Sequence, residues 1–278
     1  DELVLKRITE DPQTSQQRLS SELNLARSSL RRMMENLKLK PYRPRLLQAL
    51  NEDDPDRRIE FCEWLLQESN DDPTVLDRIL WTDEAIFQTN GRVNRHNCVY
   101  WSDTNPHLII EQELNAPRIA VWGGIWSNGV IGPFFFDGNV TGVKYLEMLR
   151  DVILPQLKKQ PIFRKMIWQQ DGAPAHYSVA VREFLDKKFS TWIGRRGTID
   201  WPPRSPDLTP CDFSLWGIIK DRVYAQNLGN FDQMKNRIVE EFAKLDHDTD
   251  LCRAICNSVL GRCKMCIETH GQQFEQLR

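Results

Sequence analysis

The stretch from Met166 to His176, MIWQQDGAPAH, decides which fold this sequence favours. It opens with a short apolar run that ends in polar residues, which is the pattern of a buried strand. Gly172 and Pro174 then break the strand. Sites in open α/β sheets gather in the crevice beyond the strand ends. Asp171 therefore lies where such a site is expected.

Two more aspartates have comparable surroundings. Asp83 follows the apolar run Ile79-Leu80-Trp81 and is followed by Ala85-Ile86-Phe87, so it reads as the polar end of another buried strand. Asp212 closes the segment PRSPDLTPCD, which begins at Pro203. Trp216, Ile219 and Val223 follow Asp212 at helical spacing, which places Asp212 on the first turn of a helix with an inward-packing face.

Three carboxylates brought together would suit a hard cation. Carboxylates favour Mg²⁺ or Mn²⁺ over softer metals, and Mg²⁺ is commonly held by one or two carboxylates, waters and substrate phosphates. Two such ions, roughly 3.5–4 Å apart, can clamp the attacking and leaving oxygens of an in-line displacement. Without metal the carboxylates would repel one another strongly. The pattern thus predicts that Asp83, Asp171 and Asp212 form a divalent-metal site, and that this site cuts phosphodiester bonds.

Each acidic residue also has an ordinary structural interpretation. Asp212 suits a helix cap, Asp207 suits a Ser-Pro-Asp turn, and Asp83 alone would suit a turn after a strand. Glu84 is expected on the opposite face of the strand from Asp83. His176 could reach the scissile phosphate or a carboxylate behind the metal, or it could be a solvated or capped loop residue. Only the joint pattern favours a site, with Glu84 and His176 as possible supporting residues.

The chain resembles the mariner-type transposases, a family with an RNase H-like catalytic fold. QDGAPAH from Gln170 to His176 is similar to the family's second-aspartate motif, and SPDLTPCDF from Ser205 to Phe213 is similar to its third. The resemblance spans nearly the whole chain and implies that Asp83, Asp171 and Asp212 are the metal ligands. Asp212 is the third ligand by motif position, where many relatives use Glu.

The spacing departs from the family pattern. The 40 residues from 172 to 211 separate the second and third aspartates, which is more than in mariner elements proper. We expect the extra residues in a loop around Trp192–Gly197, and they indicate a divergent subfamily. Arg195 and Arg196 in this loop are candidate DNA contacts.

Residues 1–45 read as three short helices that form a helix-turn-helix module. Thr14 and Gln17 match a capping box, and Asn24 suits a left-handed turn. Exposed basic and polar residues gather near the start of the third helix, where a recognition helix reads bases, and in the basic segment that follows. A helical bundle for protein contacts is the alternative. The candidate DNA-binding residues are Arg27, Ser28, Arg31, Arg32, Lys38, Lys40, Arg43 and Arg45.

The remaining chain divides into a linker with a bridging helix over 46–74 and an α/β catalytic domain over 75–278. Strand-like runs at 95–102, 119–126, 130–136 and 199–201 join those before Asp83 and Asp171, and a helix with Val143 inward follows the hairpin. A mixed sheet flanked by helices fits this order and the RNase H-like resemblance. The family also implies two helix-turn-helix units, of which one is visible, so we expect the chain to begin after the first.

Charge supports local rather than general contact with nucleic acid. The net charge of the 278 residues is −2. However, residues 12–45 hold eight Lys or Arg against two Glu, a net of +6, and residues 182–204 hold six against three acids, a net of +3. Basic character confined to patches is typical of a phosphate footprint, although ordinary solvated faces can look the same.

The seven cysteines are expected to be reduced thiols. Cys252, Cys256, Cys263 and Cys266 have offsets that fit one face of a single helix. The ends of such a row would lie roughly 21 Å apart at about 1.5 Å per residue, too far for one tetrahedral zinc ion. Core packing is therefore the expected role.

These features together predict a nuclear DNA transposase that uses Mg²⁺ or Mn²⁺, with two ions per site. Its expected partners are double-stranded DNA, as transposon ends and target, and a second copy of the chain, without a membrane or an organic cofactor. Two alternatives stay open at this point. One is a transposase-derived DNA-binding protein without activity, and the other is a nuclease that cuts without joining strands.

Overall fold

The computed structural model describes residues 2–12, 14–40, 48–88, 117–225 and 230–277. The chain forms two compact units, Asp1–Leu47 and Gln48–Arg278. The strand expected at 95–102 lies outside the described residues, as do Arg43 and Arg45. No helix in the described part is long and apolar enough to cross a membrane.

The first unit is a three-helix module around a small apolar core. Val4, Leu19 and Leu30 contribute one buried side chain from each helix. Asn24 has a φ of 49°, so the expected left-handed turn before the third helix is confirmed. The helices are α1 (Glu2–Glu10), α2 (Gln16–Glu22) and α3 (Arg27–Asn36).

The expected cap of α2 was one residue too early. Ser15 is the N-cap, and its Oγ accepts the backbone N–H of Arg18 at 3.1 Å. Thr14, which we expected to pair with Gln17 in a capping box, precedes the cap. Thr and Ser both favour the N-cap position, so the spacing of the sequence does not decide between the adjacent Thr14 and Ser15.

The second unit is built on a mixed five-stranded sheet with the order β3-β2-β1-β4-β5. The hairpin strands β2 and β3 pair antiparallel, as do β1 and β2, whereas β4 runs parallel to both β1 and β5. This confirms the predicted mixed sheet. The strands are β1 (Ile79–Gln88), β2 (Arg118–Trp126), β3 (Gly129–Phe136), β4 (Ile167–Gln169) and β5 (Trp192–Ile193).

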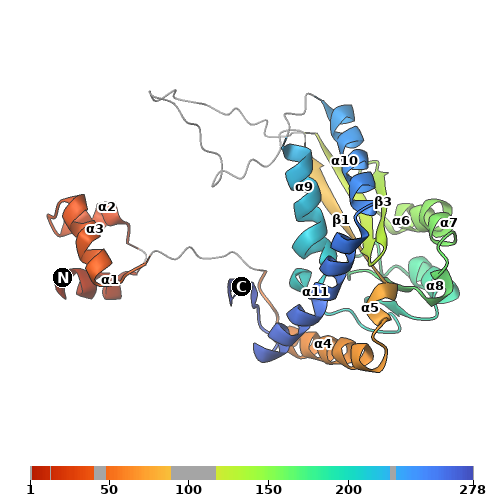
Figure 1. The fold of residues 1–278 in the computed structure, drawn as a ribbon, viewed down its shortest axis with the longest axis horizontal. Coiled ribbons are helices and arrows are strands. Elements are labelled where there is room, and N and C mark those ends of the chain that lie inside the picture. Colours follow the sequence, from red (N-terminus) through yellow and green to blue (C-terminus); the bar gives the residue numbers. More distant parts are fainter. Residues whose placement is uncertain (1, 13, 41–47, 89–116, 226–229, 278) are drawn as a thin grey trace. The chain divides into compact units, whose positions relative to one another are not determined.

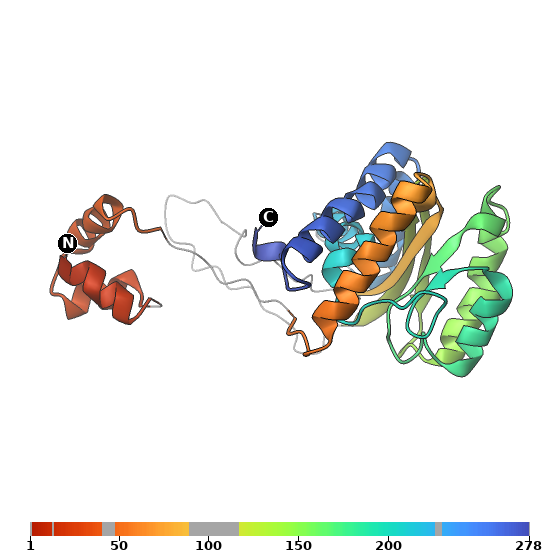
Figure 2. The ribbon, with the colours of Figure 1, turned by 90° about the horizontal axis from the view of Figure 1, so that it is seen from below.

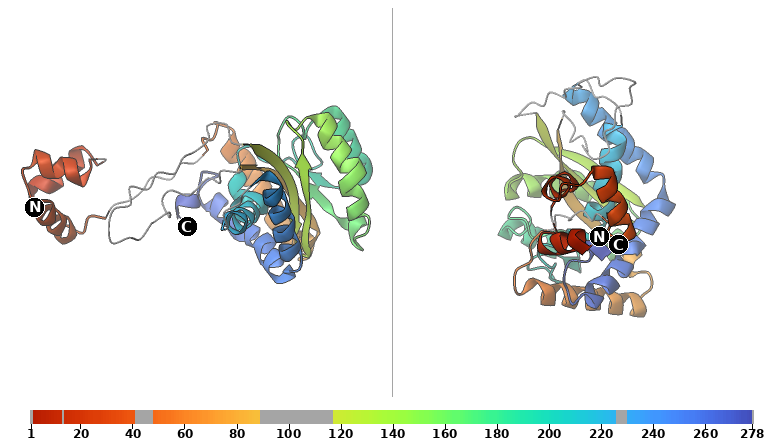
Figure 3. Two further views of the ribbon diagram at one scale, coloured as in Figure 1. Left: turned by 90° about the horizontal axis from the view of Figure 1, so that it is seen from above. Right: turned by 90° about the vertical axis from the view of Figure 1, so that its left-hand side faces the viewer.

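Helices cover both faces of this sheet, as Figures 1 and 3 show. One apolar cluster joins the sheet to the α9–α11 side and another joins it to the α6–α8 side. Alternation along β1 feeds both, because Trp81 and Phe87 enter the first cluster and Leu80 the second. The helices are α4 (Asp54–Asp71), α5 (Val75–Arg78), α6 (Gly142–Met148), α7 (Leu154–Leu157), α8 (Val179–Lys188), α9 (Trp216–Tyr224), α10 (Phe231–Asp246) and α11 (Thr249–Glu268).

Short turns of other helix types connect these elements. Two π-helical turns, η1 (Leu149–Ile153) and η4 (Cys211–Leu215), lead into α7 and α9. The 3₁₀ turns are η2 (Phe163–Lys165), η3 (Pro206–Leu208) and η5 (Glu275–Leu277).

Three expectations for the catalytic body were wrong in detail. Val143 is 68% exposed, because Tyr145 and Met148 provide the buried face of α6. The segment 192–197 is not wholly a loop, since β5 occupies its first two residues. The expected strand at 199–201 is reduced to a single bridge between Ile199 and Ile193.

Helix α4 lies within 46–74, the segment expected to be a linker with a bridging helix. It packs along α11 inside the second unit, and Figure 2 shows the two helices side by side. Cys252, Cys256, Cys263 and Cys266 all lie on α11 and are buried, which confirms the prediction of one continuous helix with core-packed thiols. Cys62 on α4 is buried against this row.

Candidate carboxylate site

Asp83 lies in the middle of β1, not at its end as expected, yet it still reaches a strand-end crevice. The parallel neighbour β4 pairs with β1 only from Ile79 to Trp81 and ends at Gln169. Thr82 closes this junction, since its Oγ1 donates to the Gln169 backbone oxygen at 2.7 Å. From Asp83 onward, β1 therefore borders the loop after β4, which carries Asp171.

The Asp83 side chain is oriented by a tryptophan from α9. Trp216 Nε1 donates to Asp83 Oδ2 at 2.8 Å. Gly123, which pairs with Asp83 across β2, makes room for this contact. A Cβ on Gly123 would lie 3.0 Å from the Trp216 ring and 2.7 Å from the Phe242 ring. A side chain at this position would thus push Trp216 away from Asp83.

The other acids hold Asp83 in a strained electrostatic environment. Burial raises the pKa of the Asp83 carboxyl well above its ordinary value, and the negative charge of Asp212 adds to the rise. Glu84 and Asp171 act in the same direction. A side chain with this environment is stabilised by any cation that neutralises the group.

Asp171 is linked to Glu84 through one histidine. His176 Nδ1 lies 2.5 Å from Asp171 Oδ1, and its Nε2 lies 3.1 Å from Glu84 Oε2. Burial alone would lower the pKa of His176, but the two carboxylates outweigh it and raise that pKa to about 10. Burial likewise opposes ionisation of Asp171, but the His176 hydrogen bond and charge bring its pKa below the ordinary value. The cation on His176 thus keeps Asp171 ionised.

A buried glutamine fixes the loop that carries both groups. Gln170 Nε2 donates to the His176 backbone oxygen at 2.8 Å. Its Oε1 accepts from Tyr145 Oη and from Trp168 Nε1, both at 3.1 Å. Tyr145 also packs on the His176 ring, with centroids 4.4 Å apart. The QDGAPAH loop is therefore held from β4 and from α6.

Asp212 enters the site from the π-helical turn η4 that precedes α9. The residue as a whole is exposed, but packing around its carboxyl group, followed by the charge of Asp171, raises its pKa to about 7. Lys220, two turns further along, lowers it in part. The expected helix start is confirmed, although its first turn is π-helical rather than α-helical.

All three aspartates line one cavity of about 1180 Å³ in the second unit, together with Glu84. Arg195 and Arg196 line the same cavity, so the structure brings these predicted DNA contacts to the carboxylates. The Arg195 guanidinium lies 4.1 Å from the Tyr177 ring centroid. Sequence reasoning missed the part of the lining that α4 contributes, which consists of Arg57, Glu60, Phe61 and Trp64.

The side chains of the site suit a hard cation by their donor atoms, but they do not form a complete coordination shell by themselves. The three aspartates offer only oxygen, which suits Mg²⁺ or Mn²⁺, and burial together with their mutual repulsion raises the pKa of Asp83 and Asp212. Across the described ranges, no three metal-ligating side chains already converge on one point. The arrangement therefore fits ions held by one or two carboxylates and completed by water and phosphate.

The predicted DNA-binding residues of the first unit can also be placed. Arg27, Ser28, Arg31 and Arg32 are exposed along α3, and Arg31 Nε pairs with Glu35 at 3.0 Å. Lys38 and Lys40 are exposed beyond the end of α3. The geometry is that of a helix with one buried apolar side at Leu30 and an exposed basic side.

The family and its relatives agree with this arrangement. The model of the DDE superfamily endonucleases matches residues 78–235, which include Asp83, Asp171 and Asp212 and exceed half of the chain. The chain belongs to the DDE superfamily endonuclease family, as the mariner-type resemblance implied.

Two transposases show how much of the chain this relationship covers. The transposable element Tc3 transposase of Caenorhabditis elegans is 27% identical over 181 residues, which is 64% of this chain and 50% of that protein. The mariner Mos1 transposase of Drosophila mauritiana is 23% identical over 284 residues, 96% of this chain and 77% of that protein. The match to Tc3 thus spans half of that relative's length.

Solved structures confirm the fold. The Mos1 transposase paired-end complex with left transposon end has a TM-score of 0.79 at 21% identity, covering 99% of this chain and 79% of that chain. The catalytic domain of Mos1 mariner transposase gives a TM-score of 0.63 at 22% identity, covering 83% of this chain and all of that chain. The RNase H-like sheet predicted from the motifs is therefore present.

Proposed function

We propose that this protein is a DNA transposase that binds transposon inverted-repeat ends, cleaves them and joins the freed 3′-hydroxyl to target DNA. The observation that carries the proposal is the convergence of Asp83, Asp171 and Asp212 on one cavity, from three separate elements. The family match over the same three residues and the naming of relatives as transposases support it.

Asp83, Asp171 and Asp212 are proposed as the metal-holding residues. The bound cations, Mg²⁺ or Mn²⁺ and two per site, would supply charge stabilisation and an activated nucleophile for in-line displacement. Mos1 structures have been solved with both Mn and Mg, which supports the choice of metals. His176 would keep Asp171 ionised and oriented, while Trp216 would orient Asp83.

The DNA would be held by two separate basic surfaces. Arg27, Ser28, Arg31 and Arg32 on α3 are proposed to read a transposon end, with Lys38, Lys40, Arg43 and Arg45 on the phosphates. Arg195 and Arg196 are proposed to hold the backbone near the scissile phosphate. A homodimer is proposed to hold two DNA ends, and the paired-end complex of Mos1 supports the pairing of ends. We also propose a nuclear location, because the proposed target is chromosomal DNA.

The proposal is tested with full-chain protein, Mg²⁺ and a plasmid carrying the inverted repeats that flank the coding sequence. Cleavage at the repeat ends followed by strand transfer is expected. Asp171→Asn should abolish cleavage and preserve DNA binding, because it removes charge but little volume. Asp200→Asn is the matched control, since Asp200 lines the same cavity outside the trio and should leave cleavage largely intact.

The outcomes separate the proposed function from its rivals. Binding without cutting by the unmodified chain would favour a DNA-binding protein, and cutting without joining would favour a nuclease. Mg²⁺-dependent cutting that persists in Asp171→Asn would remove Asp171 from the site.

A further inference from the structure

A buried ion pair lies outside the carboxylate trio and has no part in the chemistry proposed above. Arg58 on α4 donates from Nη1 and Nη2 to the two carboxylate oxygens of Asp207, at 2.7 and 2.6 Å. The two side chains are 0% and 3% exposed. Two parallel charge-assisted hydrogen bonds of this kind fix the geometry of the partner as well as its charge.

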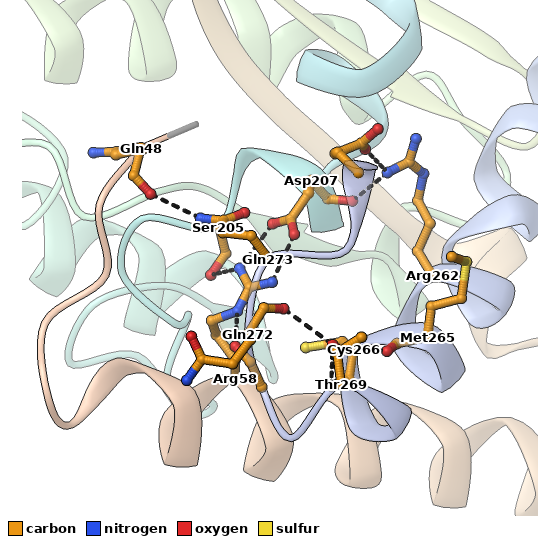
Figure 4. Close-up of polar contacts among 12 residues, drawn as sticks. Gln48, Arg58, Ser205, Asp207, Arg262, Met265, Cys266, Thr269, Gln272 and Gln273 are labelled. Carbon is orange, nitrogen blue, oxygen red and sulfur yellow. Dashed lines mark hydrogen bonds and ion pairs between the residues drawn. The ribbon is translucent and has the colours of Figure 1, made fainter. Parts of the chain in front are cut away.

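The same guanidinium also donates to two other groups, of which Ser205 is labelled in Figure 4. Nη1 donates to Ser205 Oγ at 2.9 Å, and Nε donates to the backbone oxygen of Gly271 at 2.8 Å. Arg58 thereby joins the segment that contains Ser205 and Asp207 to the turn after α11. Asp207 was expected to stabilise a Ser-Pro-Asp turn, but its carboxylate is engaged by Arg58 from a distant helix.

A second arginine holds the loop from α11. Arg262 Nη1 donates to the backbone oxygen of Asp207 at 2.8 Å, a contact also drawn in Figure 4. The Arg262 guanidinium lies 3.8 Å from the centroid of the Phe213 ring. Because Phe213 directly follows Asp212, the chain is held on both sides of this aspartate.

The five-residue step from Asp207 to Asp212 has little freedom to absorb a displacement. Pro210 restricts the backbone within this step, and Pro206 restricts it just before. The Phe213 N–H donates to the Thr209 oxygen at 3.1 Å. Cys211 Sγ contacts the backbone oxygen of Trp81 on β1 at 3.4 Å. We therefore expect a shift of Asp207 to displace Asp212 as well.

We propose that Arg58 is a positioning residue, which holds Asp212 at the carboxylate site through its bidentate pair with Asp207. The inference rests on the proposed function, because it assigns a role within that reaction. It also explains why the SPDLTPCD segment contains two aspartates with different environments. Asp207 is buried by its arginine partner, while Asp212 faces the cavity.

The property to test is the planar, two-bonded geometry of the Arg58 guanidinium, rather than its charge. Arg58→Lys keeps the positive charge but replaces the planar fork with a single ammonium group. A mutation far from the reacting atoms that displaces a catalytic group by about 1 Å can lower the rate about 100-fold. We therefore expect Arg58→Lys to slow cleavage by about that factor in single-turnover assays, with unchanged affinity for the repeat-end DNA.

Two further variants separate position from stability. Arg58→Met/Asp207→Leu replaces the pair with apolar side chains, a change that often preserves or raises stability. It should melt like the unmodified protein and still cleave slowly. Arg237→Lys is the matched control, because it makes the same change in another arginine that pairs with a buried carboxylate. Arg237 Nη2 lies 2.8 Å from Glu241 Oε1, and both residues belong to α10. This control should cleave at the normal rate.

Amide hydrogen exchange provides a readout that needs no activity. In Arg58→Lys, the amides of residues 208, 209 and 211–215 should exchange faster, while those of α10 stay unchanged. Unaltered exchange in 208–215, or full cleavage by the double variant, would overturn the positioning role. If the unmodified chain cleaves no DNA, the proposed transposase function fails, and the exchange experiment still decides whether Arg58 holds the Asp212 segment.

Discussion

Trp216 Nε1 donates a hydrogen bond to Asp83 Oδ2 at 2.8 Å, so α9 orients a carboxylate of β1. The two residues are 133 positions apart, and the contact passes over the bare backbone of Gly123. The indole N–H favours the ionised form of Asp83, because it lowers a pKa that burial and neighbouring charges raise.

Trp216→Phe should slow cleavage and preserve DNA binding. A hydrogen bond to a charged group contributes about 1.5–3 kcal/mol, so a loss of roughly tenfold or more in single-turnover rate is expected. Trp192→Phe is the control, since Trp192 Nε1 donates at 2.8 Å to Asp186, a carboxylate outside the trio. Equal rates for Trp216→Phe and the unmodified chain would show that Asp83 does not depend on this donor.

Neutralising one member of the trio should stabilise the metal-free protein. In EDTA, burial raises the pKa of Asp83 and Asp212, and repulsion among the three carboxylates raises it further. Asp212→Asn removes that repulsion, so its melting temperature in EDTA should rise by a few degrees, the shift expected of about 1 kcal/mol in a domain of this size.

The same variant should lose most of the stabilisation by Mn²⁺ that the unmodified chain shows, since a ligand bound only to the folded state raises stability. Differential scanning fluorimetry with EDTA and with Mn²⁺ measures both effects. A lower melting temperature in EDTA for Asp212→Asn would contradict the repulsion.

The loop motifs were predictable because their residue types restrict the conformation of the local backbone. Gly172 and Pro174 disfavour a strand, and β4 ends just before them, at Gln169. The spacing of Trp216, Ile219 and Val223 defines the buried face of α9. Asp83 was misplaced at a strand end because β1 continues for five more residues, to Gln88. The crevice beside Asp83 exists because the neighbouring strand β4 ends there. The length of β4 cannot be predicted from the sequence of β1.

The supporting contacts could not be predicted for related reasons. Arg58 lies in the charged run DDPDRR, which looks solvent-exposed, yet its side chain is buried against Asp207. Two-residue strands such as β5 are too short to show any periodicity. Both features depend on residues brought together by the folded chain from far along the sequence.

Removing a basic side chain from α3 should weaken DNA binding in a salt-dependent way. Arg27→Ala deletes an exposed cation near the start of this helix. If Arg27 contacts phosphate, the slope of log K against log salt should decrease in magnitude by about 0.9. Arg18→Ala is the control, because Arg18 lies on α2 and pairs with Glu22 at 2.8 Å. Fluorescence anisotropy at several salt concentrations measures the slopes, and identical slopes for the two variants would remove Arg27 from the interface.

Asp54 should make folding stability sensitive to acid. Its side chain is 1% exposed and accepts two hydrogen bonds from Arg204, which hold its pKa below the ordinary value of 3.8. A carboxyl whose pKa is lower in the folded state stabilises the fold above the unfolded pKa, and this contribution is lost as pH falls through the folded pKa. The unmodified protein should therefore lose stability relative to Asp54→Asn as pH falls below about 4. Urea unfolding of both proteins between neutral and acidic pH measures the difference, and parallel curves over that range would show that the Asp54–Arg204 pair contributes no pH-dependent stability.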